Sequence, residues 1–378
     1  MIVAGEASGD LHAAKLVSAI RDSEPAAAFE FFGSAGEKMR GSGVEAIVRA
    51  DSLSVVGLPE IGRALPMFLK AFRALKNVAV RRRPDAVVLV DFPDFNMKLA
   101  KTLSLQGFLV IYYISPQLWA WRKYRIRTIK RYVDLLISIL PFERAWYADQ
   151  GVDHVEYVGS PLAREVFATE SRESFCERHG LDPLRPIVSI LPGSRHKEIV
   201  RILPVMLAAA AQMKLERPEI QFVVTLGSTK NAEDARDILR DGSVPSVDVT
   251  LVESETFNAL NASDAAAVTS GTATLETGII GTPMAIVYKT SELNYKLLRP
   301  LIKVDHFGLI NLIAEKRVAT ELIQDDFTAE SLMEELFRLL EPPTNQEVRR
   351  ELSIAAERLG HGGASGRAAR LVLDLIDS

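Results

Sequence analysis

The sequence contains little sulfur and no long apolar run. Cys176 is the only cysteine among 378 residues, so an internal disulfide and a cysteine-built metal site are both excluded. No stretch approaches the roughly 18 consecutive apolar residues that a membrane-spanning helix needs. The N-terminus also lacks the charged and apolar regions of a signal peptide. These absences fit a protein of a reducing compartment.

Signatures of metal binding and of nucleic-acid binding are also missing. No Asp-x-Asp pair occurs, and the six histidines lack the spacing of metal ligands. A formal net charge of -4 argues against a dedicated nucleic-acid binder. No Gly-x-Ser-x-Gly nucleophile motif is present. We therefore expect no bound metal and no nucleic-acid partner.

Short apolar runs alternate with longer helical patterns along the chain. The runs are nearly continuous, which is typical of parallel strands covered by helices on both faces. Candidate strands are residues 29–33, 86–91, 108–114, 135–140 and 155–159, and then 187–191, 220–226, 247–252, 265–269 and 284–288. The sequence therefore predicts an α/β protein with two doubly wound parallel-sheet domains.

The predicted domains are residues 1–163 and 164–345, because a polar stretch separates the two series of strands. Residues 346–378 have a helical pattern with a break in the middle, and we expect these helices to pack back on the N-terminal domain. Ligands of such sheets bind at the carboxyl ends of the strands. We therefore expect the two domains to face a cleft, with a donor site on one and an acceptor site on the other.

A glycine loop follows the first strand and consists of Gly5, Glu6, Ala7, Ser8, Gly9 and Asp10. Only four residues precede it, with Ile2 and Val3 as the apolar strand, so the strand is expected to be short, which leaves open whether the native chain begins earlier. Two glycines permit a tight turn and the close approach of a ligand, and the following helix offers N–H groups to an anion. The alternative is a structural turn in which Asp10 caps a helix.

Two acids lie at the end of the predicted strand of residues 86–91, in the stretch Asp91-Phe92-Pro93-Asp94-Phe95-Asn96. A carboxylate at the carboxyl end of a strand is well placed to take a proton from a hydroxyl. Either acid could instead cap the next helix, and Asp94 is the better candidate for that role. We predict that Asp91 is a general base.

The second half has two more turns between a strand and a helix. In Leu191-Pro192-Gly193-Ser194-Arg195, the guanidinium could clamp a diphosphate. In Ser270-Gly271-Thr272, the hydroxyls suit phosphate, and Glu276 one turn later suits ribose. Each residue also has a structural alternative. Arg195 could be a surface arginine in a connecting turn, Thr272 an ordinary N-cap, and Glu276 a carboxylate that complements the helix dipole. A leaving diphosphate would be stabilised by Arg195, amides and helix dipoles instead of a cation.

Two basic segments also contain large apolar side chains. No acid occurs from residue 61 to residue 83, and a second stretch interleaves tryptophans with arginines and lysines from 119 to 131. Such segments suit anionic membrane surfaces. A helix packed on the sheet with a solvated basic side would show the same periodicity. The predicted membrane contacts are Met67, Phe68, Leu69 and Phe72.

Taken together, these motifs resemble the lipid-A-disaccharide synthase family along essentially the whole chain. The tryptophan-rich stretch has no generic structural explanation, which makes the combination specific. The matching stretches are residues 4–10, 91–96, Ser115-Pro116-Gln117-Leu118-Trp119-Ala120-Trp121-Arg122, Leu140-Pro141-Phe142-Glu143, 191–195 with Glu198, 270–276, and Asn311-Leu312.

The resemblance implies a two-domain glycosyltransferase fold of the B type and an inverting, metal-independent transfer without a cofactor. A 2,3-diacylglucosamine would pass from UDP to the 6-hydroxyl of 2,3-diacylglucosamine 1-phosphate, forming a β-1,6 disaccharide of the lipid A pathway and UDP. Family members are peripheral proteins on the cytoplasmic face of the inner membrane of Gram-negative bacteria. The oligomeric state stays open.

Carried over by position, the resemblance implies that Asp91 is the catalytic base, that Arg195 contacts phosphate and that Asn311 lies in the active site. Two positions depart from the family, with Ser160 in place of a usual histidine and Ile310 in place of a common proline. The predicted substrate-binding residues are Gly5, Glu6, Ser8, Gly9, Asp10, Ser194, Ser270, Gly271, Thr272 and Glu276.

Two rival functions stay open. A UDP-sugar epimerase on the same fold would give product without an acceptor. A non-enzymatic nucleotide-sugar sensor would bind its ligand without turnover, and it would have no use for a base at Asp91.

Overall fold

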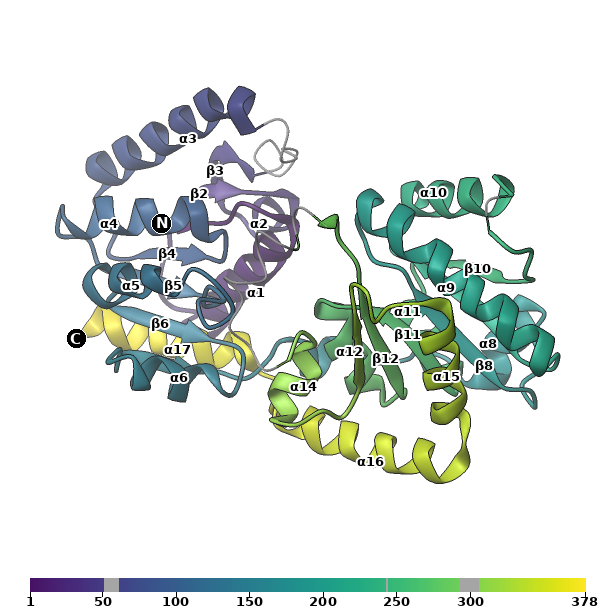
Figure 1. The fold of residues 1–378 in the computed structure, drawn as a ribbon. Helices are drawn as coiled ribbons and strands as arrows, with labels where there is room; N and C mark the ends of the chain where they lie inside the picture. The colour runs from purple at the N-terminus through teal and green to yellow at the C-terminus, as the bar shows by residue number, and fades with distance from the viewer. Residues whose placement is uncertain (51–60, 243, 293–294, 296–305) are drawn as a thin grey trace. The chain divides into compact units, whose positions relative to one another are not determined.

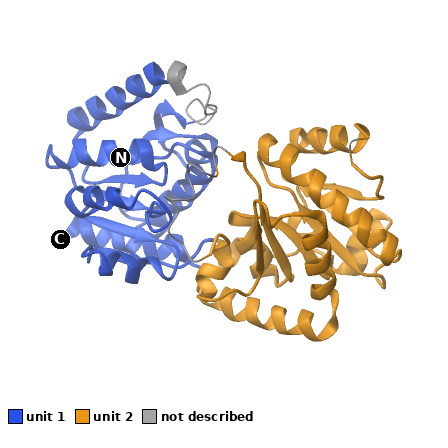
Figure 2. Cartoon of the chain, in the orientation of Figure 1, with its two compact units in different colours: residues 1–161, 361–378 blue, residues 162–360 orange. Residues whose placement is uncertain are grey.

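A computed structural model describes residues 1–50, 61–242, 244–292, 295 and 306–378. The chain divides into two compact units (Figure 2). Unit 1 contains Met1–Pro161 and His361–Ser378, and unit 2 contains Leu162–Gly360. Unit 2 is therefore inserted, in sequence, between two parts of unit 1.

Unit 1 is built on a seven-stranded parallel sheet with the order β3-β2-β1-β4-β5-β6-β7. The order reverses between β1 and β4, which pair directly, with Ile2 opposite Val88. Ligands of such sheets bind outside the carboxyl ends of the strands where the order reverses. The strands are β1 (Ile2–Val3), β2 (Phe32–Ala35), β3 (Glu45–Arg49), β4 (Val87–Val90), β5 (Val110–Tyr113), β6 (Leu135–Ser138) and β7 (Val155–Tyr157).

Helices cover both faces of this sheet. Because side chains alternate along a strand, Val87 and Leu89 enter one buried cluster with α3 and α4, while Val88 and Val90 enter another with α1 and α17. Figure 1 shows α17 in yellow beside α1 in purple, and the two helices are in contact. The helices of unit 1 are α1 (Ala7–Ser23), α2 (Glu37–Gly41), α3 (Ile61–Arg82), α4 (Pro93–Ser104), α5 (Ile126–Tyr132), α6 (Glu143–Asp149) and α17 (Ala364–Asp377).

Unit 2 repeats the plan with a six-stranded parallel sheet of order β10-β9-β8-β11-β12-β13. Its order reverses between β8 and β11. The strands are β8 (Ile187–Leu191), β9 (Gln221–Leu226), β10 (Thr250–Glu253), β11 (Ala265–Thr269), β12 (Met284–Tyr288) and β13 (Thr320–Ile323). The helices are α7 (Leu162–Glu165), α8 (Arg172–His179), α9 (His196–Glu216), α10 (Thr229–Arg240), α11 (Thr256–Ala262), α12 (Thr272–Ile280), α14 (Leu309–Ala314), α15 (Ala329–Leu340) and α16 (Pro342–Glu357).

Only the second of the two C-terminal helices packs on unit 1, whereas we expected this of both helices in residues 346–378. Helix α16 contacts α12, α14 and α15 within unit 2, whereas α17 belongs to unit 1. Gly360, Gly362 and Gly363 separate the two helices, with φ values of 85°, 81° and 72° that favour glycine. In unit 1, Arg367 donates a hydrogen bond of 2.8 Å from Nε to the Val158 carbonyl.

Candidate active site

The turn after β4 places Asp91 where the strand order of unit 1 reverses. Asp91 and Phe92 have φ values of 46° and 51°, a left-handed conformation that costs about 1–3 kcal/mol per residue with a side chain. Three hydrogen bonds hold the main chain there. The Asp91 N–H donates to the Tyr113 carbonyl at 3.0 Å, and the Asp91 carbonyl accepts from the Tyr112 hydroxyl at 2.7 Å and from Asn96 Nδ2 at 2.8 Å. The surroundings thus impose the strained backbone of this turn.

Burial raises the pKa of Asp91 to about 6, and the charge of the nearby Glu6 carboxylate acts in the same direction. A backbone hydrogen bond from Phe92 opposes both effects. A general base works best when its pKa lies near the working pH, because it is then ionised and still binds a proton well. The environment of Asp91 therefore suits proton transfer.

The glycine loop packs against the same turn. A Cβ atom on Gly5 would lie 2.3 Å from Cδ1 of the Phe92 ring, so a larger residue would push the two turns apart. A Cβ atom on Gly9 would make only ordinary contacts, the nearest at 3.6 Å. Glu6 and Ser8 are exposed at the start of α1, whereas Gly9 is buried. The side chains of Glu6 and Ser8 are thus accessible to solvent at this loop.

Asp10, a predicted substrate contact, has the structural role of a helix cap that the sequence left open as the alternative. Its side chain is buried, and it accepts three backbone hydrogen bonds. The donors are Gly36 at 2.7 Å, Lys38 at 2.8 Å and Met39 at 3.3 Å. Asp10 therefore caps α2, which lies far along the chain, instead of the helix in which it sits.

Unit 2 contains a pocket of about 360 Å³ at the carboxyl ends of β8 and β11. The turns after these two strands and the start of α12 form much of its wall. The pocket brings together the predicted residues Ser194, Arg195, Ser270, Gly271, Thr272 and Glu276.

The turn after β8 is held by Glu198, which also lines the pocket. Glu198 Oε2 accepts from the backbone N–H groups of Ser194 and Arg195, both at 3.3 Å. Gly193 has a φ of 109°, and a Cβ atom there would lie 2.7 Å from the same oxygen. The Arg195 side chain remains 83% exposed and makes one ion pair of 3.0 Å with Glu198. Its guanidinium can therefore turn toward a bound anion.

The turn after β11 leads into α12, whose first N–H groups lie at the pocket wall. Ser270 Oγ donates to the Phe307 carbonyl at 2.9 Å, so this hydroxyl supports the neighbouring loop. Glu276 is partly buried in the first turns of α12, and burial raises the pKa of its carboxyl group. A helix N-terminus beside Arg195 is a suitable environment for phosphate groups.

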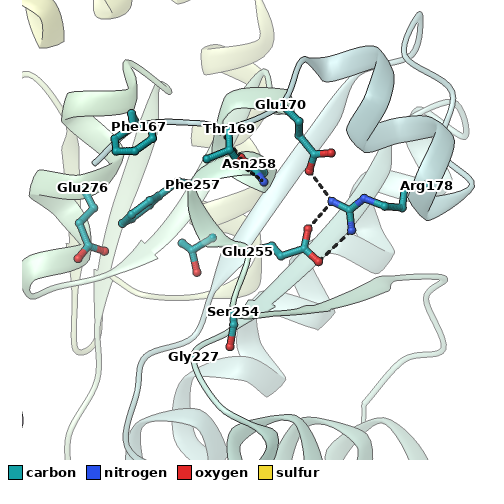
Figure 3. A pocket seen from close by; sticks show the side chains of 11 residues that line it. Phe167, Thr169, Glu170, Arg178, Gly227, Ser254, Glu255, Phe257, Asn258 and Glu276 are labelled. Atoms are coloured by element: carbon teal, nitrogen blue, oxygen red, sulfur yellow. Dashed lines mark hydrogen bonds and ion pairs between the residues drawn. The ribbon is translucent and has the colours of Figure 1, made fainter. Parts of the chain in front are cut away.

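A second pocket of about 780 Å³ adjoins the first (Figure 3). The two share Gly227, Thr256 and Glu276, so they form one continuous depression in unit 2. Figure 3 shows Phe167 and Phe257 near Glu276. Our sequence analysis missed these aromatic residues because they come from separate segments and carry no motif.

The opposite wall of this second pocket is an ion-pair cluster. Arg178 on α8 pairs with Glu170 and Glu255, including a bond of 2.9 Å to Glu255 Oε1 (Figure 3). Asn258 Oδ1 accepts from the Thr169 N–H at 2.8 Å. These contacts fix the segment before α8 against the start of α11, which gives the pocket a defined shape.

Asn311, which the sequence predicts as a catalytic residue, is buried inside unit 2. Its Nδ2 donates to the Ala319 carbonyl at 2.7 Å and to Glu321 Oε1 at 2.9 Å. Its Oδ1 accepts from the N–H groups of Val318 and Ala319, both at 2.9 Å. Both donors and both lone pairs of the amide are thus used within the fold.

The role of Asn311 is to support the loop before α14. Glu321, its partner on β13, also accepts from the N–H groups of Phe307 and Gly308, at 3.0 and 2.8 Å. Phe307 is in turn the partner of Ser270. Asn311 therefore acts on the phosphate side of the pocket only through other residues. Its neighbour Ile310, one of the two departures from the family, is buried and lies so close to α12 that a Cβ atom on Gly278 would be 2.6 Å away.

The predicted membrane residues on α3 divide into two groups. Met67, Phe68 and Phe72 are partly buried against the core of unit 1, and the Phe68 ring lies 6.2 Å from the ring of Phe92. Leu69 remains 47% exposed, and Leu65, which lies one turn earlier, is 55% exposed. The apolar side of α3 is thus continuous with the turn that carries Asp91. Within the described ranges, no helix has the length and hydropathy needed to cross a bilayer.

Residues 1–371 match the family model described as lipid-A-disaccharide synthetase. Lipid-A-disaccharide synthase of Geobacter sulfurreducens is 42% identical over 377 residues, an alignment that covers 100% of this chain and 97% of that protein. The chain belongs to the lipid-A-disaccharide synthetase family. It is accordingly an enzyme, a UDP-sugar-dependent glycosyltransferase of lipid A synthesis.

Solved structures with low sequence identity share the fold of this family member. A putative UDP-N-acetylglucosamine 2-epimerase from Listeria monocytogenes superposes with a TM-score of 0.66 at 15% identity, covering 100% of this chain and 96% of the other. The calicheamicin glycosyltransferase CalG4 gives 0.60 at 15% identity, with coverages of 100% and 96%. The predicted two-domain fold of the glycosyltransferase B type is thereby confirmed.

Proposed function

We propose that the chain transfers 2,3-diacylglucosamine from UDP to the 6-hydroxyl of 2,3-diacylglucosamine 1-phosphate, and that Asp91 is the base. The observation that carries the assignment of the base is the raised pKa of a carboxylate held in a strained turn where the strands reverse. The acceptor hydroxyl gives its proton to the Asp91 carboxylate while its oxygen attacks the anomeric carbon of the donor. The bond to UDP breaks in the same displacement, which inverts the configuration.

Unit 2 is proposed to hold the donor nucleotide. Its smaller pocket combines a helix N-terminus with an exposed arginine, which suits the diphosphate. Glu276 lies where the two pockets meet and can accept hydrogen bonds from ribose hydroxyls. The larger pocket, with Phe257 in its wall, then holds the flat uracil ring of the nucleotide.

We further propose that the departing diphosphate is stabilised by Arg195 and by backbone N–H groups, without a metal ion or cofactor. The basis is the chemistry of the pocket wall, which offers cationic and N–H donors to an anion. Activity in excess chelator, after the protein has been stripped of metal, should equal activity with added Mg²⁺. A requirement for a divalent cation would overturn this part of the proposal.

Unit 1 is proposed to take the acceptor and to meet the membrane peripherally, at the cytoplasmic face of the inner membrane. Exposed Leu65 and Leu69 on a helix rich in basic residues support this surface. The same helix contacts Phe92, the neighbour of Asp91. Acyl chains of the acceptor that lie along α3 would therefore place the acceptor sugar near Asp91.

The decisive experiment measures UDP release in detergent with the diacylated donor, in the presence and absence of the diacylglucosamine 1-phosphate acceptor. Release that depends on the acceptor and forms a disaccharide supports transfer. Product formed without acceptor would indicate the epimerase alternative, and saturable binding without turnover would indicate a sensor. Asp91→Ala, with unchanged circular dichroism, should lower acceptor-dependent release by at least about 10²-fold.

A further inference from the structure

The segment of residues 115–121, named here the tryptophan loop, is attached at both ends to the turn that carries Asp91. At its start, β5 ends at Tyr113, whose carbonyl accepts the Asp91 N–H. At its end, Arg122 donates to Asp94 Oδ1 at 2.8 Å, and Arg125 pairs with the same carboxylate. The loop is therefore flanked by contacts to the turn of Asp91 and to the start of α4, which follows that turn.

The middle of the tryptophan loop is held by one face of α6. Glu143 Oε1 accepts from Trp119 Nε1 at 3.1 Å, and the Tyr147 hydroxyl donates to the Pro116 carbonyl at 2.9 Å. Because residues four apart share a helix face, Glu143 and Tyr147 act side by side on two points of the loop. The ring of Phe142 also meets that of Trp119 edge to face, with centroids 5.1 Å apart.

An apolar residue at position 143 would pack without the desolvation cost that the carboxylate of Glu143 carries. The residue is buried, and a buried carboxylate loses hydration that an apolar side chain would never have had. Its geometry shows a specific use of both oxygens, since Oε2 accepts from the Leu140 N–H at 3.3 Å while Oε1 holds the indole. Buried polar networks of this kind fix one arrangement among several that apolar packing would tolerate.

The outward side of the tryptophan loop carries groups that suit a phosphorylated sugar. Gln117 is exposed, and Trp121 is 39% exposed. The guanidinium of Arg122 lies 4.2 Å from the centre of the Trp121 ring. An exposed amide, an indole face and a cation are suited to bind a sugar ring and its phosphate.

We propose that Glu143 and Tyr147 are positioning residues for the acceptor: from α6 they hold the tryptophan loop beside Asp91, so that the loop presents the acceptor sugar to the base. This inference rests on the proposed function and names a determinant of acceptor binding within it. Neither residue touches the substrate. Their effect passes through Trp119 and Pro116 to the exposed side of the loop.

The test compares Glu143→Gln and Tyr147→Phe with the wild-type enzyme in separate titrations of acceptor and donor. Glu143→Gln should lower kcat/KM for the acceptor about tenfold and leave the KM for the UDP-sugar within about twofold, because the loop lies in unit 1 and the donor pocket in unit 2. Tyr147→Phe removes one hydroxyl and should shift the same parameter in the same direction by a few-fold. The double variant should lose less than the product of the two single losses, since both residues hold one loop.

Glu335→Gln is the matched control. Glu335 is a buried glutamate on α15 in unit 2, bonded at 2.8 Å to Arg338 Nε, and it lines neither pocket. Its loss should lower the melting temperature without separating acceptor from donor kinetics. If Glu143→Gln and Tyr147→Phe behave like this control, the two residues are structural and the inference is overturned. If Glu143→Gln fails to fold, Tyr147→Phe alone decides the question.

A spectroscopic readout distinguishes positioning from general destabilisation. Burial raises the pKa of Glu143 to about 7, with hydrogen bonds from Trp119 and Leu140 opposing the shift. The near-ultraviolet circular dichroism of the wild type should therefore include a component that titrates near pH 7 and is absent from Glu143→Gln, whereas the contribution of Asp91, near pH 6, should persist in both. Burial also raises the pKa of Tyr147 and of Tyr157 on β7, the latter to about 12, so neither tyrosine contributes in this range. An identical titration in the variant would overturn the inference.

Acceptor-dependent UDP release by the wild-type enzyme distinguishes a failure of this inference from a failure of the proposed function. If the wild type releases no UDP in response to acceptor, the proposed function fails before any variant is compared. If the wild type shows acceptor-dependent release and the variants match it, the transferase stands and only the role of Glu143 and Tyr147 falls.

Discussion

The two units have the same strand order around their points of reversal, yet the chemistry placed there is opposite. In unit 1 the turn after β4 and the loop after β1 bring together two carboxylates, Asp91 and Glu6, and the pKa of Asp91 rises. In unit 2 the turns after β8 and β11 bring together an exposed arginine and a helix N-terminus. A parallel sheet therefore supplies the location, while the residues in the turns decide whether it accepts protons or binds anions.

The largest expected effect tests the carboxylate side of this comparison. Asp91→Ala should lower kcat by about 10²- to 10⁴-fold, because the acceptor hydroxyl loses its base. The KM for the UDP-sugar should change little, since the donor pocket lies in unit 2. Steady-state kinetics of UDP release measures both parameters. Turnover close to that of the wild type would remove Asp91 from the role of base.

The next effect tests the anion-binding side. Arg195→Ala should lower kcat by about 10²-fold, because a donor that stabilises the leaving diphosphate is lost. Arg201→Ala, on the same helix α9, exposed and outside the pocket, is the matched control and should leave kcat unchanged. A change confined to the KM for the acceptor would contradict the assignment of Arg195 to the leaving diphosphate.

A smaller effect concerns the apolar surface of unit 1. Leu65→Ser with Leu69→Ser should weaken binding to vesicles that contain anionic lipid by at least about tenfold, since each serine removes up to about 1.5–3 kcal/mol of burial in the bilayer. Activity on detergent-dispersed substrates should persist. Val80→Ser, on the same helix and 46% exposed, is the control in a vesicle sedimentation assay. Equal losses in the control and in the double variant would argue against a localised membrane surface.

The smallest effect is on stability and depends on pH. The pKa of Asp91 is raised above its ordinary value of 3.8 to about 6, so the folded state binds this proton more tightly than the unfolded chain. Ionisation therefore destabilises the folded state as pH rises from about 4 to 6, and the penalty remains above pH 6. Asp91→Asn should relieve it, adding about 3 kcal/mol at most at pH 8 and nothing at pH 3.5. Thermal melts at both pH values, with exposed Asp149→Asn for comparison, measure the difference.

Much of the fold follows from local patterns. Buried parallel strands such as β4 and β11 are continuous apolar runs that end at a glycine or polar turn, so the sequence predicts both the strand and the site beside it. The edge strands β3 and β13 escaped prediction. Their sequences, Glu45–Arg49 and Thr320–Ile323, include charged residues because one side of an edge strand meets solvent.

The site residues divide in the same way. Arg195 and Glu276 lie in turns that a motif identifies, and the structure brings them into one pocket. Asp10 and Asn311 carry equally suggestive side chains, yet their hydrogen bonds go to distant backbone groups, which no local pattern reveals. Phe257 and Arg178 have no motif around them, and only the folded chain shows that they share a pocket wall with Glu276.

Helix α17 has a consequence for how the protein is made. It supplies buried residues, among them Ala368 and Val372, to the core of unit 1, although it follows the whole of unit 2 in the sequence. The whole of unit 2 leaves the ribosome before this helix does. Unit 2 can therefore complete its core during synthesis, while the flank of α1 in unit 1 stays uncovered until α17 has been made.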